Sequence, residues 1–299
     1  MAGIRIGTSE QGGTFWTQGQ AVAKLFTRDH GIETTVLDAD QASIENARRL
    51  HDDLIDFGFM ASNWIGRAYR GDAPFDAPVD IRMAAPANSG AMFFITRADS
   101  SLRTVRDMIG KRVAIGPVGS GMVQHIHTIF GALGISFDQF TPLNMSFEDG
   151  GKALEQGAID AQWQCPYPNE VMHNISQRFD VRVLDYSGDD LKTVLDKAGF
   201  YRHAVMPKEF FRGVSHDTEQ LAVVNIIATH ARTDSQTVCK FVRSILDNLD
   251  ELARINPLFT GLGDVFEPLK TQGTSALEFG GVPLHPGAIE AFRQVGLLK

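Results

Sequence analysis

The chain has 299 residues, of which 43% are hydrophobic, and a formal net charge of -8. This length exceeds the size at which one hydrophobic core usually keeps growing, so two compact lobes are expected. The acidic balance provides no basic surface for nucleic acid, and no apolar run reaches the roughly 18 residues that a membrane-spanning helix needs.

The first third of the chain alternates between segments typical of strands and of helices. Strands are predicted at 4–8, 34–37, 57–60 and 81–85, and helices at 14–26, 43–50 and 63–69. This order, with short connections, indicates a mostly parallel sheet that is covered by helices on both faces.

A second α/β round begins at the strongly β-prone segment 92–96. Further strands are predicted at 112–115, 141–145, 161–164 and 181–184, and helices at 122–133, 147–156 and 189–197. After Tyr201 the pattern changes to one β-like run at 223–229, followed by helices at 235–248, 250–255 and 287–295. A helical tail without its own sheet predicts discontinuous lobes, with residues 1–89 and 205–299 in lobe 1 and residues 90–204 in lobe 2.

The first candidate ligand loop contains Ser9, Gly12, Gly13 and Thr14 and leads from a strand into a helix. Small residues let the backbone approach a ligand, and the first turn of a helix exposes unpaired N–H groups. The glycine spacing does not match the dinucleotide-binding fingerprint. The alternative is a tight turn that needs glycine for a positive φ.

A second glycine turn lies at the equivalent point of the second round. Its candidate residues are Gly119, Ser120, Gly121 and Met122. Open α/β sheets bind ligands at the carboxyl ends of their strands, where both turns are expected. Two helix N-termini would hold a carboxylate without a cationic side chain.

Two other strand-to-helix junctions contribute candidates. Ser43 is predicted to cap its helix, whereas Gln41 and Asn46 have no evident structural role and are expected to face a cleft. Ser62, at the next junction, is either a ligand contact or a helix cap.

The segment 162–168 combines polar, aromatic and proline residues. Alternation places Gln162 and Gln164 on one face of a strand and Trp163 on the other. Buried amides without partners are costly, so Gln162, Gln164 and Tyr167 are predicted to line a site. Core packing is the alternative for each tryptophan, including Trp163.

Catalytic patterns are sparse in this sequence. His125 and His127 diverge on a helix and cannot chelate one metal as an i, i+4 pair does. Cys165 could in principle act with a histidine as a nucleophile and base. We expect Cys165 and Cys239 to be buried free thiols, with one long-range disulfide bridge as the alternative, and we expect neither metal nor cofactor.

The ordered motifs resemble the TAXI family, the extracytoplasmic solute receptors of tripartite ATP-independent transporters. The resemblance covers nearly the whole chain. It is carried by Ile6-Gly7-Thr8-Ser9 with Gly12-Gly13-Thr14, by Ser43-Ile44-Glu45-Asn46, by Gly110-Lys111-Arg112-Val113-Ala114-Ile115-Gly116 with Gly119-Ser120-Gly121, and by Pro283-Leu284-His285-Pro286-Gly287-Ala288.

The resemblance implies a type II periplasmic-binding-protein fold, with two α/β lobes, a hinge and a ligand cleft between them. It also implies capture of a small organic anion for membrane permease subunits, and we expect a monomer. The expected location is periplasmic or extracytoplasmic if a signal peptide has been removed, and cytoplasmic if Met1 is native. Alternatives are a cytoplasmic enzyme of the same fold and a ligand-sensing protein.

The sequence departs from the family at two places that line the pocket. Relatives commonly have Gly-Gly-Ser where this chain has Gln41-Ala42-Ser43. The segment after Ala161 is usually apolar and then glycine-bearing, whereas here it begins Gln162-Trp163-Gln164. The best-known amino-acid ligands of the family are therefore not assumed.

Overall fold

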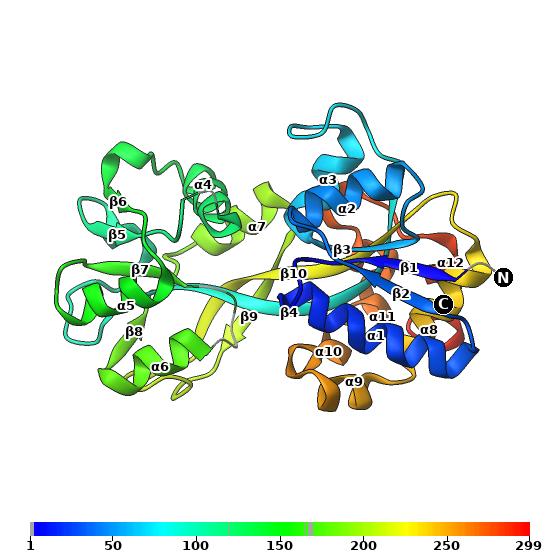
Figure 1. Cartoon of the computed structure of the whole chain (residues 1–299). Helices are drawn as coiled ribbons and strands as arrows, with labels where there is room; N and C mark the ends of the chain where they lie inside the picture. The colour runs from blue at the N-terminus through cyan, green and yellow to red at the C-terminus, as the bar shows by residue number, and fades with distance from the viewer. Residues whose placement is uncertain (1–2, 119, 165, 167–169) are drawn as a thin grey trace. The chain divides into compact units, whose positions relative to one another are not determined.

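The structure is a computed structural model that describes residues 3–118, 120–164, 166 and 170–299. The chain divides into two compact units, which we call unit 1 (1–89 and 224–299) and unit 2 (90–223). Two long strands, β4 (Ile81–Arg97) and β10 (Thr218–His230), pass from one unit into the other (Figure 1).

The sheet of unit 1 has a parallel core. Strand β1 (Ile4–Gly7) pairs in parallel with β2 (Thr34–Leu37) on one side and with β3 (Phe57–Ala61) on the other. The second half of β10 then pairs antiparallel with β3. The carboxyl ends of β1, β2 and β3 therefore meet at one edge of the sheet.

Helices cover both faces of this sheet, as predicted for an α/β unit. Helices α2 (Ala42–His51) and α3 (Ser62–Arg70) lie on one face, and α1 (Thr14–His30) and α8 (Ser235–Leu246) lie on the other (Figure 1). Helix α12 (Pro286–Gln294) packs on α8.

An aromatic stack joins the C-terminal tail to the sheet of unit 1. The ring of Phe241 on α8 stacks on that of Phe57 on β3 with 3.8 Å between centroids, and it lies 5.6 Å from the ring of Phe26 on α1. All three side chains are fully buried. Burial of these rings explains why a tail without a sheet of its own folds onto the first α/β round.

The sheet of unit 2 is also parallel at its centre. Strand β5 (Arg112–Ala114) pairs in parallel with β6 (Thr141–Leu143) and β7 (Ala161–Gln164). Strand β4 is antiparallel to β7 and to β8 (Val181–Val183).

Two hydrophobic cores lie on the two faces of this second sheet. One contains Phe94 and Trp163 and is covered by α4 (Gly121–Leu133) and α7 (Asp190–Ala198). The other contains Phe93 and Ile95 and is covered by α5 (Phe147–Glu155) and α6 (Glu170–Arg178). Shorter elements complete the chain: Val105–Met108, Phe137–Gln139, α9 (Leu249–Ile255), Pro257–Phe259, α10 (Leu262–Phe266), α11 (Leu269–Gln272), Gly273–Leu277 and Phe279–Gly281.

The structure differs from the sequence prediction in the crossing segments. The strands predicted at 81–85 and 92–96 form the single strand β4, because its two ends have partners in different units. Strand β9 (Tyr201–Met206), which was not predicted, pairs with the first half of β10. This hairpin holds residues 201–223 in unit 2, so the second crossing lies at residue 223 rather than near residue 204.

Candidate ligand-binding sites at the strand ends

The loop after β1 leads into α1 through Gly12, which has a φ of +83°. Gly13 is the N-cap of α1 and has no side chain that could accept a capping hydrogen bond. Instead, the hydroxyl of the buried Ser9 accepts a hydrogen bond from the N–H of Trp16 at 3.3 Å. Thr14 is exposed at the first helical position. Ser9 is thus a structural cap, and the turn gives Gly12 the positive φ that glycine favours.

The first turn of α1 keeps two free donors. In the described part of the chain, the N–H groups of Thr14 and Phe15 have no hydrogen-bond partner. The first turn also contains no acidic side chain that would neutralise the helix dipole. This helix end can therefore bind an anion or a carbonyl oxygen.

At the junction before α2, Ser43 has a structural role that differs from the predicted helix cap. Helix α2 begins at Ala42, so Ser43 is not its N-cap, and the Ser43 hydroxyl accepts a hydrogen bond from the N–H of Ala61 at 3.1 Å. Ala42 has a φ of +37°, a region that L-residues other than glycine seldom adopt. The Gln41 side chain is exposed, as a ligand contact would be.

Asn46 has a clear structural role, which corrects the expectation that it has none. Its side chain is fully buried, and its Nδ2 donates to the carbonyl oxygens of Thr8 at 2.8 Å and Phe59 at 2.9 Å. The side chain therefore ties the ends of β1 and β3 together. Its Oδ1 atom is buried without a partner.

The junction between β3 and α3 places Ser62 at the first helical position, fully buried. The preceding residue, Ala61, is the N-cap and provides no side-chain bond, so Ser62 does not cap the helix. The next residue, Asn63, has a buried Oδ1 atom without a partner.

The glycine turn of unit 2 follows β5. Gly116 has a φ of +99°, and Ser120 is the N-cap of α4. The Ser120 hydroxyl makes no cap bond and is buried without a partner. The N–H groups of Gly121 and Met122 also lack partners among the described residues. Gly119 lies outside the described residues.

The end of β7 carries two buried glutamines. Gln162 donates from Nε2 to the carbonyl oxygen of Phe147 at 2.7 Å, whereas its Oε1 has no partner. Gln164 is 0% exposed, and both its Nε2 and its Oε1 lack a partner. Trp163, on the opposite face, is a core residue whose Nε1 donates to the carbonyl oxygen of Met122 at 3.2 Å. Cys165 and Tyr167 lie outside the described residues.

Unpartnered buried atoms concentrate at these strand ends. Among the described residues, eleven buried side-chain nitrogen or oxygen atoms lack a hydrogen-bond partner, and six belong to the junctions above. These six are Asn46 Oδ1, Asn63 Oδ1, Ser120 Oγ, Gln162 Oε1, Gln164 Nε2 and Gln164 Oε1. Buried polar groups are normally paired, so each of these atoms is a candidate ligand contact within its own unit.

The sequence analysis missed an amide cluster beside the crossing strands. In unit 1, Asn88 Oδ1 on β4 accepts from Gln18 Nε2 at 3.2 Å and from Asn225 Nδ2 on β10 at 3.1 Å. Gln18 is fully buried on the apolar face of α1, and its Oε1 is unpartnered. A polar residue between Phe15 and Val22 on that face was the available signal.

The two histidines considered for catalysis are occupied by packing. His125 is buried, and its Nδ1 lies 2.7 Å from the hydroxyl of Tyr201. Burial lowers the pKa of His125 to about 4 and raises that of Tyr201. The His127 ring stacks on Phe137 with 4.0 Å between centroids.

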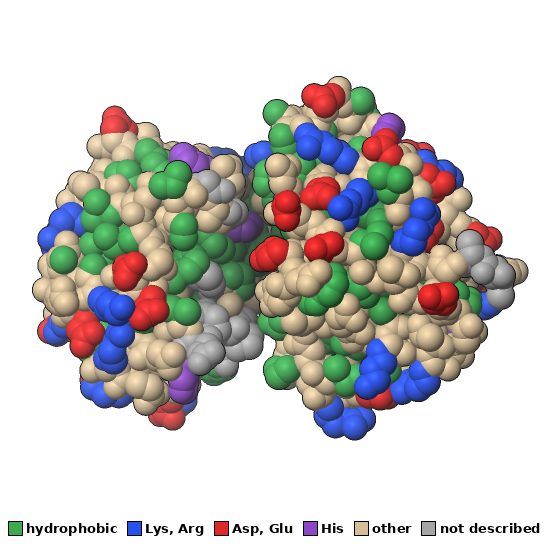
Figure 2. Space-filling model, in the orientation of Figure 1, with side chains coloured by type: hydrophobic (Ala, Val, Ile, Leu, Met, Phe, Trp, Pro, Cys, Tyr) green, Lys and Arg blue, Asp and Glu red, His purple; other side chains and the backbone are tan. Residues whose placement is uncertain are grey.

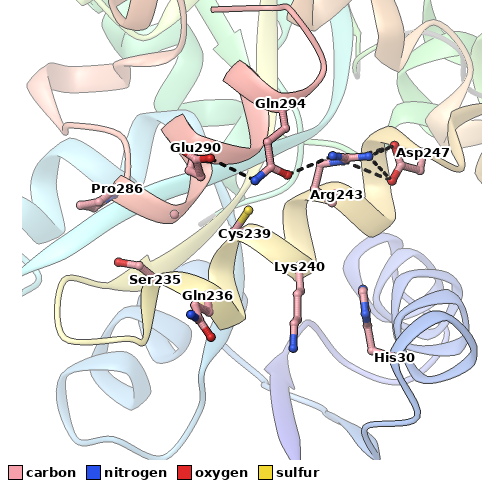
Figure 3. A pocket seen from close by; sticks show the side chains of 11 residues that line it. His30, Ser235, Gln236, Cys239, Lys240, Arg243, Asp247, Pro286, Glu290 and Gln294 are labelled. Atoms are coloured by element: carbon pink, nitrogen blue, oxygen red, sulfur yellow. Dashed lines mark hydrogen bonds and ion pairs between the residues drawn. The ribbon is translucent and has the colours of Figure 1, made fainter.

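A groove of about 620 Å³ lies between α8 and α12 of unit 1 (Figure 3). Its polar side chains pair with one another: Arg243 bonds Asp247 and Gln294, and Gln294 bonds Glu290. Burial and the nearby Glu290 raise the pKa of the Cys239 thiol, so it stays protonated. The groove reaches His30 at the far end of α1, about 25 Å from the ligand loop at 1.5 Å per residue.

Three further features of the described residues concern cavities, metals and membrane spans. A smaller cavity of about 270 Å³ is lined by residues that include Arg48, His51 and Phe75. Across the described residues, no group of three His, Cys, Asp or Glu side chains is arranged to hold a metal, and no helix is long and apolar enough to cross a membrane. Charges of both signs are interspersed on the face shown in Figure 2.

A family model described as the NMT1-like family matches residues 6–296. Among solved structures, the TctC solute binding protein from Polaromonas is similar at a TM-score of 0.54 and 15% identity, covering 88% of this chain and 98% of that one. The periplasmic aliphatic sulphonate binding protein SsuA from Escherichia coli has a TM-score of 0.52 and 15% identity, with 100% and 89% covered. A putative sulfonate-binding SsuA from Methylobacillus flagellatus KT has a TM-score of 0.51 and 12% identity, with 100% and 88% covered. These similarities establish the two-lobed periplasmic-binding-protein fold.

Proposed function

The chain belongs to the NMT1-like family, and from that premise we propose that it is an extracytoplasmic solute receptor of the TAXI type. It binds a small organic anion of the carboxylate type and delivers it to the membrane permease subunits of a secondary transporter. The solved structures that share its fold include a TctC solute binding protein and a periplasmic sulphonate binding protein, which supports this class of function.

The concentration of unpartnered buried polar atoms at the strand ends is the observation that carries the proposal. A buried polar atom without a partner costs free energy, roughly 1 to 3 kcal/mol each, unless a ligand or solvent satisfies it. A solute that pairs with these atoms regains that free energy on binding. An enzyme would need, in addition, a titratable group at the same place, whereas the unpartnered atoms belong to neutral amides and a hydroxyl.

The helix N-termini hold the carboxylate in this proposal. Helices α1 and α4 have first-turn N–H groups that find no partner in the described part of the chain, and neither first turn contains an acidic residue. Helix α5 provides the contrast, because its first turn contains Glu148 and Asp149 and its N-cap Ser146 accepts a hydrogen bond from Asp149 N. Of these three helices, only α1 and α4 begin without an acidic residue or a side-chain cap bond, which leaves their positive ends open to an anion.

The connecting segments at the strand ends carry no cation to assist them. Residues 8–14, 38–43, 61–64, 115–122 and 143–147 contain neither Lys nor Arg. Arg49 reaches the carbonyl oxygen of Asp38, but it is paired with Glu45. Backbone dipoles and neutral donors therefore hold the anion.

The remaining predicted residues are assigned within each unit separately. We assign ligand contacts to Gly12, Gly13, Thr14 and Gln41 in unit 1, and to Ser120, Gly121, Met122 and Gln164 in unit 2, with Gly119 and Tyr167 as further candidates. Ser9, Ser43, Asn46, Ser62 and Gln162 shape the backbone that presents these contacts.

A binding screen tests the proposal directly. The protein is titrated calorimetrically with a panel of small mono- and dicarboxylates and sulfonates, and the change in unfolding temperature is recorded in parallel. A ligand at 100 times its Kd stabilises a protein by about 2.7 kcal/mol, which gives a readily measured shift. Absence of both heat and shift across the panel would refute the receptor proposal.

A pair of variants distinguishes a loss of ligand affinity at the site from a loss of stability of the whole protein. Ser120→Ala alters a proposed ligand contact, whereas Asp234→Ala alters the cap of α8, a helix that contributes no residue to the proposed site. We expect weaker binding in the first variant and unchanged binding in the second. The reverse result would place the ligand elsewhere.

A further inference from the structure

We infer that Gln164 determines the specificity of this receptor and that its ligand carries a primary carboxamide in addition to a carboxylate. This inference rests on the proposed function and names the substrate class of the same site. It is carried by the two unpartnered atoms of a fully buried side chain.

Gln164 is the last residue of β7, at the carboxyl edge of the unit 2 sheet. It pairs with Phe93 of β4, and alternation places its side chain on the same face of β7 as that of Gln162. That face is covered by α5, whose Phe147 carbonyl accepts from Gln162. Gln162 is thus hydrogen-bonded to the helix. Gln164 lies two residues further toward the carboxyl end of β7 and has no such hydrogen bond.

The glycine turn of unit 2 begins close to the end of β7. Strands β5 and β7 are parallel with Ala114 opposite Gln162, and Gly116 follows Ala114 by two residues along the chain, as Gln164 follows Gln162. A Cβ on Gly116 would lie 3.4 Å from Ser120 Oγ and 3.7 Å from the ring of Phe147. The Ser120 hydroxyl, the open end of α4 and the Gln164 amide therefore occupy one neighbourhood.

The chemistry of the amide selects the ligand group. A carboxamide presents two N–H donors and one carbonyl acceptor. Since both Gln164 atoms are unpartnered, either orientation of the side chain offers a donor and an acceptor side by side. A primary carboxamide on the ligand matches both, because its carbonyl accepts from Nε2 and its N–H donates to Oε1.

A carboxylate at the same place matches only half of the Gln164 side chain. It can accept from Nε2, but it has no proton for Oε1 and would leave that buried oxygen unpaired against a negative charge. Sites built around such hydrogen bonds reject analogues that lack them far better than apolar pockets reject a missing methylene. The uncharged edge formed by residues 115–122 and 143–147 offers no cation to offset the repulsion.

Matched ligand pairs test this inference on the unaltered protein. Succinamate is compared with succinate and glutaramate with glutarate, and L-asparagine and L-glutamine with L-aspartate and L-glutamate. The second set adds an ammonium group, which tests whether the preference persists when the ligand also carries a positive charge. Calorimetric titration gives the ratio of the two Kd values within each pair.

We expect the carboxamide member of the pair that binds to be favoured at least about tenfold. Equal affinity, or tighter binding of the diacid, overturns the inference. If no pair binds but another carboxylate or sulfonate does, the inference is also overturned and the receptor proposal stands. If nothing in the whole panel binds, the receptor proposal itself fails.

Variants assign the preference to the side chain. Gln164→Met removes both the donors and the acceptor while keeping the approximate size, and it is expected to reduce the amide preference to less than twofold. Gln220→Met is the matched control, at a fully buried glutamine on β10 of unit 2 whose Nε2 donates to the carbonyl oxygen of Leu184, and it is expected to lower the unfolding temperature while leaving the preference intact. Loss of the preference in the control alone would overturn the role of Gln164, and circular dichroism verifies that each variant is folded.

Discussion

At the scale of single residues, the buried carboxamides at the strand ends fall into two groups. Asn46 and Gln162 donate to backbone carbonyl oxygens and fasten helices to strand ends. Gln164 has no such bond, although it is as deeply buried. The same residue type therefore serves structure at some positions and remains available to a ligand at another, and only the partners distinguish the two.

Asn46 provides a prediction about stability. Asn46→Asp replaces two N–H donors by a carboxylate that faces the carbonyl oxygens of Thr8 and Phe59. We expect a loss of roughly 2 to 4 kcal/mol in the free energy of unfolding, measured with urea. Gln41→Ala, at the exposed start of the same helix, should change it by less than about 0.5 kcal/mol. Equal effects would show that the Asn46 bonds contribute nothing.

His125 provides a prediction about pH. Burial lowers its pKa to about 4 in the folded protein, below the value of about 6.5 in the unfolded chain. The unfolded chain therefore binds more protons between these values, and stability falls as pH falls through this window. The free energy of unfolding of the parent protein should decrease between pH 7 and pH 4. We expect this decrease to be smaller by up to roughly 3 kcal/mol in His125→Asn, whose side chain can still bond Tyr201. Parallel stability curves for the variant and the parent protein would contradict this origin.

At the scale of elements, the helix N-termini differ in whether the chain itself satisfies them. Helix α5 is closed by a serine cap and two acidic residues, whereas α1 and α4 begin at glycine-rich turns with neither. The turns after β1 and β5 are thus equivalent in the two α/β rounds. This equivalence was predictable from the sequence, since each strand is followed by glycine and then by apolar residues at helical spacing.

The two serines at helix starts in unit 2 form a matched test. Ser146→Ala removes a hydrogen bond of 3.0 Å to the N–H of Asp149 and should cost about 1 kcal/mol of stability. Ser120→Ala removes a buried hydroxyl that has no partner, so stability should stay within about 0.5 kcal/mol or rise. Thermal and urea unfolding of both variants measures the difference. A larger loss for Ser120→Ala would mean that its hydroxyl has a structural role.

At the scale of the whole molecule, the net charge of -8 is opposed to the binding of an anion. The proposed site overcomes this with dipoles that act over the length of one helix turn. Glu10, Asp38 and Asp40 are exposed at the strand ends of unit 1 and add to this electrostatic opposition there.

Salt dependence tests this electrostatic picture. With no ion pair to the ligand, the Kd of the best carboxylate should change by less than about twofold between 50 and 500 mM NaCl, because salt screens charges rather than short hydrogen bonds. Calorimetric titration at the two salt concentrations measures it. A severalfold weakening would instead implicate a cation, such as Arg67, whose guanidinium lies 5.2 Å from the Trp64 ring.

The sequence by itself determined the alternation of strands and helices, because apolar periodicity is a local property of the chain. It also placed both glycine turns, and the positive φ values of Gly12 and Gly116 follow from local turn geometry. The order of motifs further indicated a two-lobed binding-protein fold, in agreement with the similar solved structures.

Only the tertiary structure decided the pairing of distant residues. The hairpin of β9 with β10, the role of Asn46 between two strand ends and the capping of α1 by Ser9 all depend on neighbours far along the chain or across a turn. The same holds for the glutamines of β7. The spacing of the sequence placed Gln162 and Gln164 on one face of the strand. The packing of α5 then gave a hydrogen-bond partner to Gln162 Nε2 and none to the side chain of Gln164.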